Sequence, residues 1–238
     1  MQAGYSFVSD PANGLSDEYL ELSRIACLAT KDGLMTDNGW DYVAVRQYVR
    51  LYHELQRLNM LQIYLHGGST PCGTGLLTVA HRNTPDNRRG ESVYANTIAI
   101  ISQVNKARRT TNKEFYVVKF HDKDTARIMY QELTYIRPLC CMLGRTCLGS
   151  DIDSPLLFPS LVNPAEACKT TELTKVLQEY TQKAPGFPIG CRLFRQITMA
   201  ITEKHVKSIS RPFDQYDDKS GEASVSVGFA WQSGHGPL

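Results

Sequence analysis

Two β-branched runs lie close together in a chain whose other regular segments favour helices. They are TIAIISQV (residues 97–104) and EFYVVKF (residues 114–120), and the polar stretch NKARRTTNK separates them. β-Branched and aromatic runs joined by a short polar segment are typical of an antiparallel hairpin. We therefore predict a hairpin with a long, positively charged tip.

The longest predicted helix begins after Asn38 and ends at Gly67. Apolar residues recur in it near the 3.6-residue period of one helix face, which predicts that this face is buried. Its members are Val43, Tyr48, Leu51, Leu55, Leu58 and Leu65.

Four further segments have helical signals. Residues 15–33 begin with Ser16 as the expected N-cap, and residues 171–182 begin with Thr171 in the same role. Residues 122–143 form a helix that Pro138 is expected to kink or end. The fourth helix covers residues 191–210.

These elements predict a mainly α protein with a small antiparallel β-sheet of two or three strands. At 238 residues the chain is long enough to bury a sizeable core. We expect residues 1–36 to be an N-terminal helical extension, or the remnant of a preceding domain, and residues 37–238 to be the main domain.

Positive charge gathers in two segments of the chain. Residues 104–123 and residues 191–211 each carry a net charge of +4, although the whole chain carries only +2. Concentrated positive charge suits a polyanionic partner such as nucleic acid. The alternative is that both segments are ordinary solvated faces.

Several function classes lack sequence support. The seven cysteines form no CxxC pair or Cys/His cluster, so we expect buried thiols in a reducing compartment rather than zinc or disulfides. No P-loop, GxSxG or HExxH motif is present. No apolar run approaches a membrane span, and the first residues do not resemble a secretory signal. We expect no cofactor, no metal, no membrane partner and no small-molecule substrate.

The order of motifs from about Trp40 to Leu238 resembles the catalytic domain of tyrosine recombinases. A hairpin with a basic tip is followed by a helix, an LLF segment (156–158), another helix, a basic RLFRQ helix (192–196) and a Gly-His pair (234–235). The similarity is greatest to recombinase-like domains of fungal Crypton-type mobile elements and related fungal proteins. The resemblance implies a DNA breaking-rejoining fold, in which a tyrosine attacks a phosphodiester while arginines, a lysine and a histidine assist.

The resemblance assigns vestigial catalytic roles to three residues. Arg195 matches the arginine of the family's His-x-x-Arg motif, and Arg192 occupies the histidine position of that motif. His235 matches the Gly-His histidine. Lys106 matches the hairpin lysine, and Lys113 on the same loop is the alternative.

Other expected groups are replaced or absent. Cys72, in GGSTPCGTGLL, stands where the family has its first arginine, and Gly75 stands where it has a glutamate. The nucleophilic tyrosine is expected about nine residues after His235, so the domain is expected to be incomplete at its C-terminus. A free thiol is mostly neutral at pH 7 and cannot replace a permanent cation. We therefore expect no strand cleavage by this chain alone.

The leading prediction is a DNA-binding relic of a mobile-element recombinase that contacts mainly phosphates of double-stranded DNA. Two alternatives stay open: an active recombinase or transposase subunit whose tyrosine comes from a partner or a missing exon, and a decayed fragment without function. The resemblance implies a nuclear location, with the cytoplasm as the alternative to it, and allows a homo-oligomer on DNA. The expected DNA-binding residues are Arg108, Arg109, Lys113, Arg192, Lys204 and Lys207.

Overall fold

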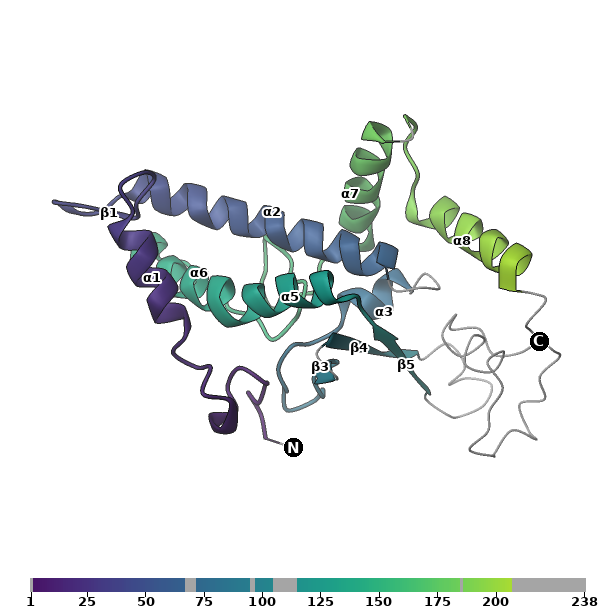
Figure 1. Ribbon diagram of the computed structural model, residues 1–238, viewed down its shortest axis with the longest axis horizontal. Helices are drawn as coiled ribbons and strands as arrows, with labels where there is room; N and C mark the ends of the chain where they lie inside the picture. The colour runs from purple at the N-terminus through teal and green to yellow at the C-terminus, as the bar shows by residue number, and fades with distance from the viewer. Residues whose placement is uncertain (1, 67–71, 95–96, 105–114, 185, 207–238) are drawn as a thin grey trace.

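The protein is mainly helical and carries a small antiparallel sheet, as a computed structural model shows (Figure 1). The structure describes residues 2–66, 72–94, 97–104, 115–184 and 186–206. The coarse fold prediction, mainly α with a small antiparallel sheet, is confirmed. The helical segments are η1 (Pro11–Asn13), α1 (Tyr19–Leu28), α2 (Tyr42–His66), α3 (Gly73–Leu77), α5 (Lys123–Gln131), η2 (Glu132–Ile136), α6 (Arg137–Leu143), η3 (Gly144–Leu148), α7 (Thr170–Lys183) and α8 (Cys191–Val206).

The predicted hairpin is present and gains a third strand. β4 (Thr97–Val104) pairs antiparallel with β5 (Phe115–Phe120) on one side and with β3 (Glu91–Tyr94) on the other. Opposite residues of paired strands share a face, so Glu91, Ile100 and Lys119 form one row across the sheet. This face packs on the helices, because Ile98 and Ile100 belong to the main hydrophobic core. A separate small hairpin joins β1 (Met35–Thr36) to β2 (Gly39–Trp40).

The long helix α2 begins where the side chain of Asp41 accepts the backbone N–H groups of Val43 and Ala44, at 2.9 and 3.0 Å. The prediction of which face of α2 is buried is wrong. None of the six expected positions is buried, and Val43 and Leu51 are 75% and 56% exposed.

The face of α2 that is buried contains two polar residues, Gln56 and Asn59, among its apolar ones. Because these two polar residues interrupt the hydrophobic pattern, the 3.6-residue period in the sequence follows a neighbouring face of α2 rather than the face that is buried. The buried residues of α2 are Val45, Val49, Tyr52, Gln56, Asn59, Met60, Leu61, Ile63 and Tyr64.

Pro138 does not end its helix. Before it, η2 is a π-helical turn in which the Arg137 N–H donates to the carbonyl of Glu132. This wider turn changes the hydrogen-bond register, and Pro138 then lies in the first turn of α6, where a missing N–H is tolerated. The helical path continues through η3 to Leu148.

The two expected side-chain caps are also wrong. α1 begins at Tyr19 with Glu18 at the N-cap, and α7 begins at Thr170 with Lys169 at the N-cap; neither cap residue makes a side-chain hydrogen bond to its helix. Ser16 instead donates to the carbonyl of Val8 at 3.3 Å.

Two hydrophobic clusters hold the elements together. The larger one joins the second half of α2 to α3, α5, α7 and the sheet, and the smaller one joins α1 and the first half of α2 to α6. Phe7 belongs to the larger cluster, and Leu22 of α1 packs on the smaller one. The boundary expected after residue 36 stays a prediction. Within the described ranges, no helix is long and apolar enough to cross a membrane.

Candidate functional site at the end of α2

The last turn of α2 meets the starts of two other helices around Tyr64. The Tyr64 hydroxyl donates to the carbonyl of Cys191, the first residue of α8, at 3.4 Å. The Tyr64 ring also packs against Phe194, with ring centroids 5.8 Å apart. Tyr64 belongs to the main core, so it fixes the start of α8 against the body of the protein.

Cys72 and Arg195 both influence the same hydroxyl electrostatically. Burial raises the pKa of Tyr64, and the neighbouring Cys191 and Cys72 raise it further. The Arg195 guanidinium opposes this rise in the Tyr64 pKa, since a cation favours the charged phenolate. Two residues far apart in the sequence, one just before α3 and one in the second turn of α8, therefore act on the same hydroxyl.

This convergence involves both positions that the resemblance assigns to phosphate-binding arginines. Arg195 supplies a guanidinium at one of them, and Cys72 places a thiol at the other. The arrangement can bind one phosphate oxygen through a fork of N–H donors, but it lacks the second permanent cation. The roles of Arg195 and Cys72 stay predictions.

The basic residues expected to bind DNA from α8 do not all lie on one face of the helix. Arg192 is exposed and lies one turn before Arg195, which is half-buried. Lys204 is exposed but lies two and a half turns after Arg195, so it projects from the opposite side of the helix. Figure 1 shows α8 as an outlying helix beyond α7.

Six sequence-predicted residues lie outside the described part of the chain. Four were expected on the hairpin tip, one near the end of the helix predicted over residues 191–210, and one in the Gly-His pair. They are Arg108, Arg109, Lys113, Lys106, Lys207 and His235.

A His-Asp pair lies beside the same end of α2, and the sequence analysis missed it. His66 Nδ1 is 3.2 Å from Asp122 Oδ2. Asp122 also accepts the Thr125 hydroxyl at 2.5 Å and caps α5 through the N–H groups of Asp124 and Thr125. The bonds from Thr125 hold the pKa of Asp122 well below its usual range, so this carboxylate is ionised. The cap was visible in the sequence as an Asp before a helical run, but its histidine partner is distant in sequence.

Two basic residues at the end of β5 are buried. Lys119 and His121 lie on the inner face of the sheet, and burial lowers their pKa values to about 8 and about 4. Both ring nitrogens of His121 lack a hydrogen-bond partner within the described ranges. Lys119 had been counted in the basic segment 104–123, so part of that charge faces the interior rather than solvent.

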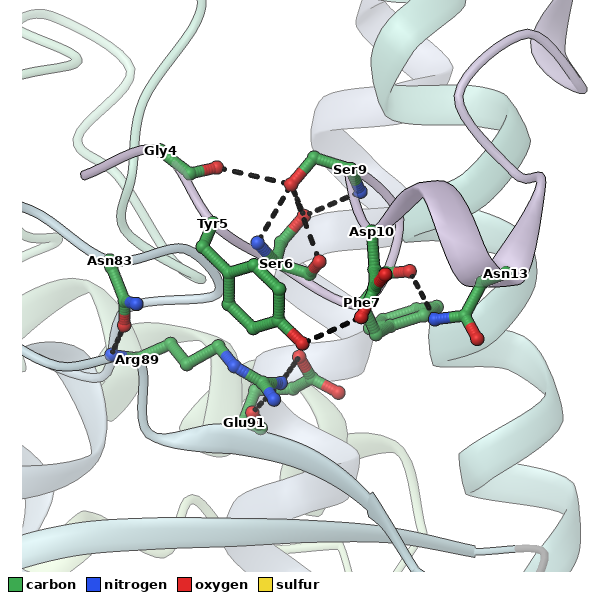
Figure 2. Close-up of polar contacts among 10 residues, drawn as sticks. All are labelled: Gly4, Tyr5, Ser6, Phe7, Ser9, Asp10, Asn13, Asn83, Arg89 and Glu91. Atoms are coloured by element: carbon green, nitrogen blue, oxygen red, sulfur yellow. Dashed lines mark hydrogen bonds and ion pairs between the residues drawn. The ribbon is translucent and has the colours of Figure 1, made fainter. Parts of the chain in front are cut away.

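A second polar cluster lies away from this site, where the N-terminal segment contacts Asn83 and Arg89 in the stretch that leads into β3 (Figure 2). The Arg89 guanidinium lies 5.2 Å from the ring centroid of Tyr5 and donates to the Glu91 carbonyl at 2.8 Å. The Tyr5 hydroxyl donates to Asp10 at 2.8 Å, and Asn83 accepts the Arg89 backbone N–H at 2.9 Å.

The Glu91 carboxylate in this cluster is fully buried. Its nearest cation is Arg89, at 3.8 Å, and neither carboxylate oxygen has a hydrogen-bond partner among the described residues. Burial raises the pKa of Glu91 to about 7, because an ion without donors is poorly stabilised in the interior.

All seven cysteines are free thiols, and Cys140 and Cys141 are buried. No group of three or more potential metal ligands lies within the part of the chain that the structure describes. No protein-family model, curated protein or solved structure matches the chain.

Proposed function

We propose that the chain binds double-stranded DNA through a degenerate tyrosine-recombinase-like domain that does not cleave DNA at this site. The observation that carries the proposal is the convergence of Cys72 and Arg195 on Tyr64. In the family that the sequence resembles, these two positions hold the arginines that grip the reacting phosphate.

The replacement at Cys72 supports the absence of cleavage. A phosphoryl-transfer transition state gathers negative charge, which preorganised cations must stabilise as it forms. A thiol stays mostly neutral at pH 7, whereas a guanidinium is permanently charged. With one arginine of the pair missing, Arg195 supports phosphate binding better than it supports catalysis.

Exposure of the first turn of α8 supports phosphate contact. Arg192 is exposed one turn before Arg195, and residues at this spacing lie on the same side of a helix. Contacts of this kind attach to the DNA backbone and carry little sequence information. The proposal is therefore a binding mode with weak sequence preference.

The test is the affinity of the full chain for a 20-base-pair duplex at a fixed, low salt concentration. The double variant Arg192→Ala/Arg195→Ala is expected to bind about tenfold more weakly, since each lost phosphate contact removes part of the electrostatic attraction. The matched control is Arg24→Ala on α1, an exposed arginine paired with Glu21 at the other end of the molecule. Equal affinities for all three proteins would refute the role of α8.

A further inference from the structure

A recess of about 490 Å³ lies between α2, the segment 158–169 and the start of α7. Met60 and Phe158 are both buried and provide apolar surface inside it. Pockets of this volume hold small organic molecules, so the recess has room for two aliphatic side chains. Neither Cys72 nor Arg195 is among the described residues that line it, so the recess is separate from the candidate site.

The turn at residues 160–166, which forms one wall of the recess, is held in shape by its own hydrogen bonds. The Ser160 N–H donates to the carbonyl of Glu166 at 2.8 Å, and the Glu166 N–H donates to the carbonyl of Asn163 at 2.9 Å. The side-chain amide of Asn163 also donates to the Glu166 carboxylate at 2.9 Å. A turn that is already closed in this way loses little conformational freedom when it binds a partner.

Two aliphatic residues, Leu161 and Val162, form an exposed apolar tip on this turn. Val162 is 95% exposed and Leu161 is 58% exposed, and both border the recess. Contiguous exposed apolar groups with polar surroundings are typical of interaction surfaces. One face of the molecule therefore carries an apolar tip next to an apolar recess.

A tip beside a recess is complementary to a second copy of the same face. In a two-fold symmetric dimer the same patch of both subunits meets, so each tip enters the recess of the other subunit. The same contact then forms twice, and both recesses are filled. An unrelated protein would have to present its own tip and recess in this same arrangement.

The total charge around the recess does not favour or strongly oppose this contact. Four acids and three cations surround it, and most of them are already paired within the chain. Arg57 pairs with Glu54 and Glu179, at 2.9 and 3.0 Å, and Lys175 pairs with Glu172 at 2.8 Å. Two faces that each carry a net charge of −1 repel only weakly at physiological salt, so association depends on the apolar contact.

The remaining two charges are complementary across a two-fold axis. Glu166 and Lys169 are both exposed, and neither makes an ion pair among the residues that the structure describes. They flank the recess, so the Glu166 carboxylate of one copy can pair with the Lys169 ammonium of the second copy, and the reverse pair forms by symmetry.

We propose that the turn 160–166 and the recess beside it form the contact face of a two-fold symmetric dimer. Leu161 and Val162 of each subunit pack against Met60 and Phe158 of the other, and Glu166 pairs with Lys169 across the interface. The proposal does not rest on DNA binding, since none of the described residues of α8 lines the recess.

The test is sedimentation equilibrium of the full chain from about 5 to about 300 µM, without DNA. A monomer–dimer equilibrium is expected, with a dissociation constant of about 10–100 µM, as for a small transient interface. Val162→Asp places a charge in the apolar recess and is expected to raise this constant at least tenfold. Because Val162 is almost fully exposed, the substitution should leave the fold of the monomer unchanged.

Val43→Asp is the matched control, because Val43 is also an exposed valine and is not among the described residues that line the recess. It should leave the dissociation constant unchanged. A wild type that is monomeric at 300 µM would overturn the proposal and point to another occupant of the recess. Equal dissociation constants for Val162→Asp and the wild type would overturn it as well.

A charge exchange tests the register of the two copies. Glu166→Lys and Lys169→Glu each place like charges opposite one another and are expected to raise the dissociation constant about threefold. The double variant restores opposite charges across the axis, so it is expected to dimerise more tightly than either single variant. A double variant that dimerises more weakly than both would overturn the proposed arrangement.

Discussion

Glu91 makes the stability of this protein depend on pH in a direction opposite to that of most carboxylates. Its side chain is fully buried, its oxygens have no donors among the described residues, and Arg89 stays 3.8 Å away. The folded state therefore holds the Glu91 proton more tightly than the unfolded chain does. The contribution of protonated Glu91 to the unfolding free energy is fully present below the unfolded pKa of 4.5. That contribution is lost as the pH rises through the folded pKa of about 7.

The size of the effect follows from the same two pKa values. Raising the pKa from 4.5 to about 7 corresponds to about 3 kcal/mol of unfolding free energy between acidic and alkaline conditions. Glu91→Gln has nearly the same shape and cannot ionise. We expect the variant to match the wild type near pH 4.5 and to exceed its unfolding free energy by up to about 3 kcal/mol at pH 8.

The assay is urea unfolding followed by far-ultraviolet circular dichroism and by tryptophan fluorescence at pH 5 and pH 8. Coincident transitions from the two probes are needed before a single free energy is assigned. A difference between the Gln variant and the wild type that is the same at both pH values would refute the reasoning.

Glu132 provides the matched control. It is also buried, but it accepts a hydrogen bond from Arg137 Nε at 2.9 Å. Glu132→Gln leaves the buried guanidinium without its counter-ion and is expected to cost about 3–5 kcal/mol at both pH values. We therefore expect the Glu→Gln substitution to raise the unfolding free energy at Glu91 at pH 8 and to lower it at Glu132.

Three further outcomes are expected. Cys72→Arg restores a cation beside Arg195, so it should strengthen binding to duplex DNA and add about one to the salt slope; unchanged binding would exclude Cys72 from the DNA surface. Asp122→Ala removes the cap of α5 and should lower the unfolding free energy by about 1–2 kcal/mol, whereas Asp124→Ala on the exposed side of the first turn should change it by less than about 0.5 kcal/mol. Tyr5→Leu should lower stability by about 1 kcal/mol through loss of the Arg89 contact, and no loss would show that the N-terminal segment is weakly docked.

Local signals predict the elements of this fold well. The hairpin and the long helix are confirmed because β-branched runs and helical periods are properties of neighbouring residues. The buried face of α2 was wrong because it depends on what packs against it: the core accepts Gln56 and Asn59, which a hydrophobic pattern excludes. Ser16 and Thr171 failed as caps because the helices begin at Tyr19 and Thr170, so Ser16 lies three residues before its helix and Thr171 lies inside its helix.

The candidate site was less accessible to sequence reasoning. Cys72 and Arg195 drew attention only through a resemblance, and no local pattern connects them to Tyr64. The charge of segment 104–123 was visible, but a count of charges does not show that Lys119 faces the core. The buried position of Glu91 likewise follows from the register of three strands, which the sequence does not specify.

DNA binding by the full chain, titrated from about 50 to about 300 mM salt, tests the central proposal most directly. The proposal predicts a dissociation constant that rises along a straight log–log line, with a slope that falls by about two when Arg192 and Arg195 are both changed to alanine. No binding at the lowest salt, or a slope that the double substitution leaves unchanged, would contradict the proposed phosphate contact of α8.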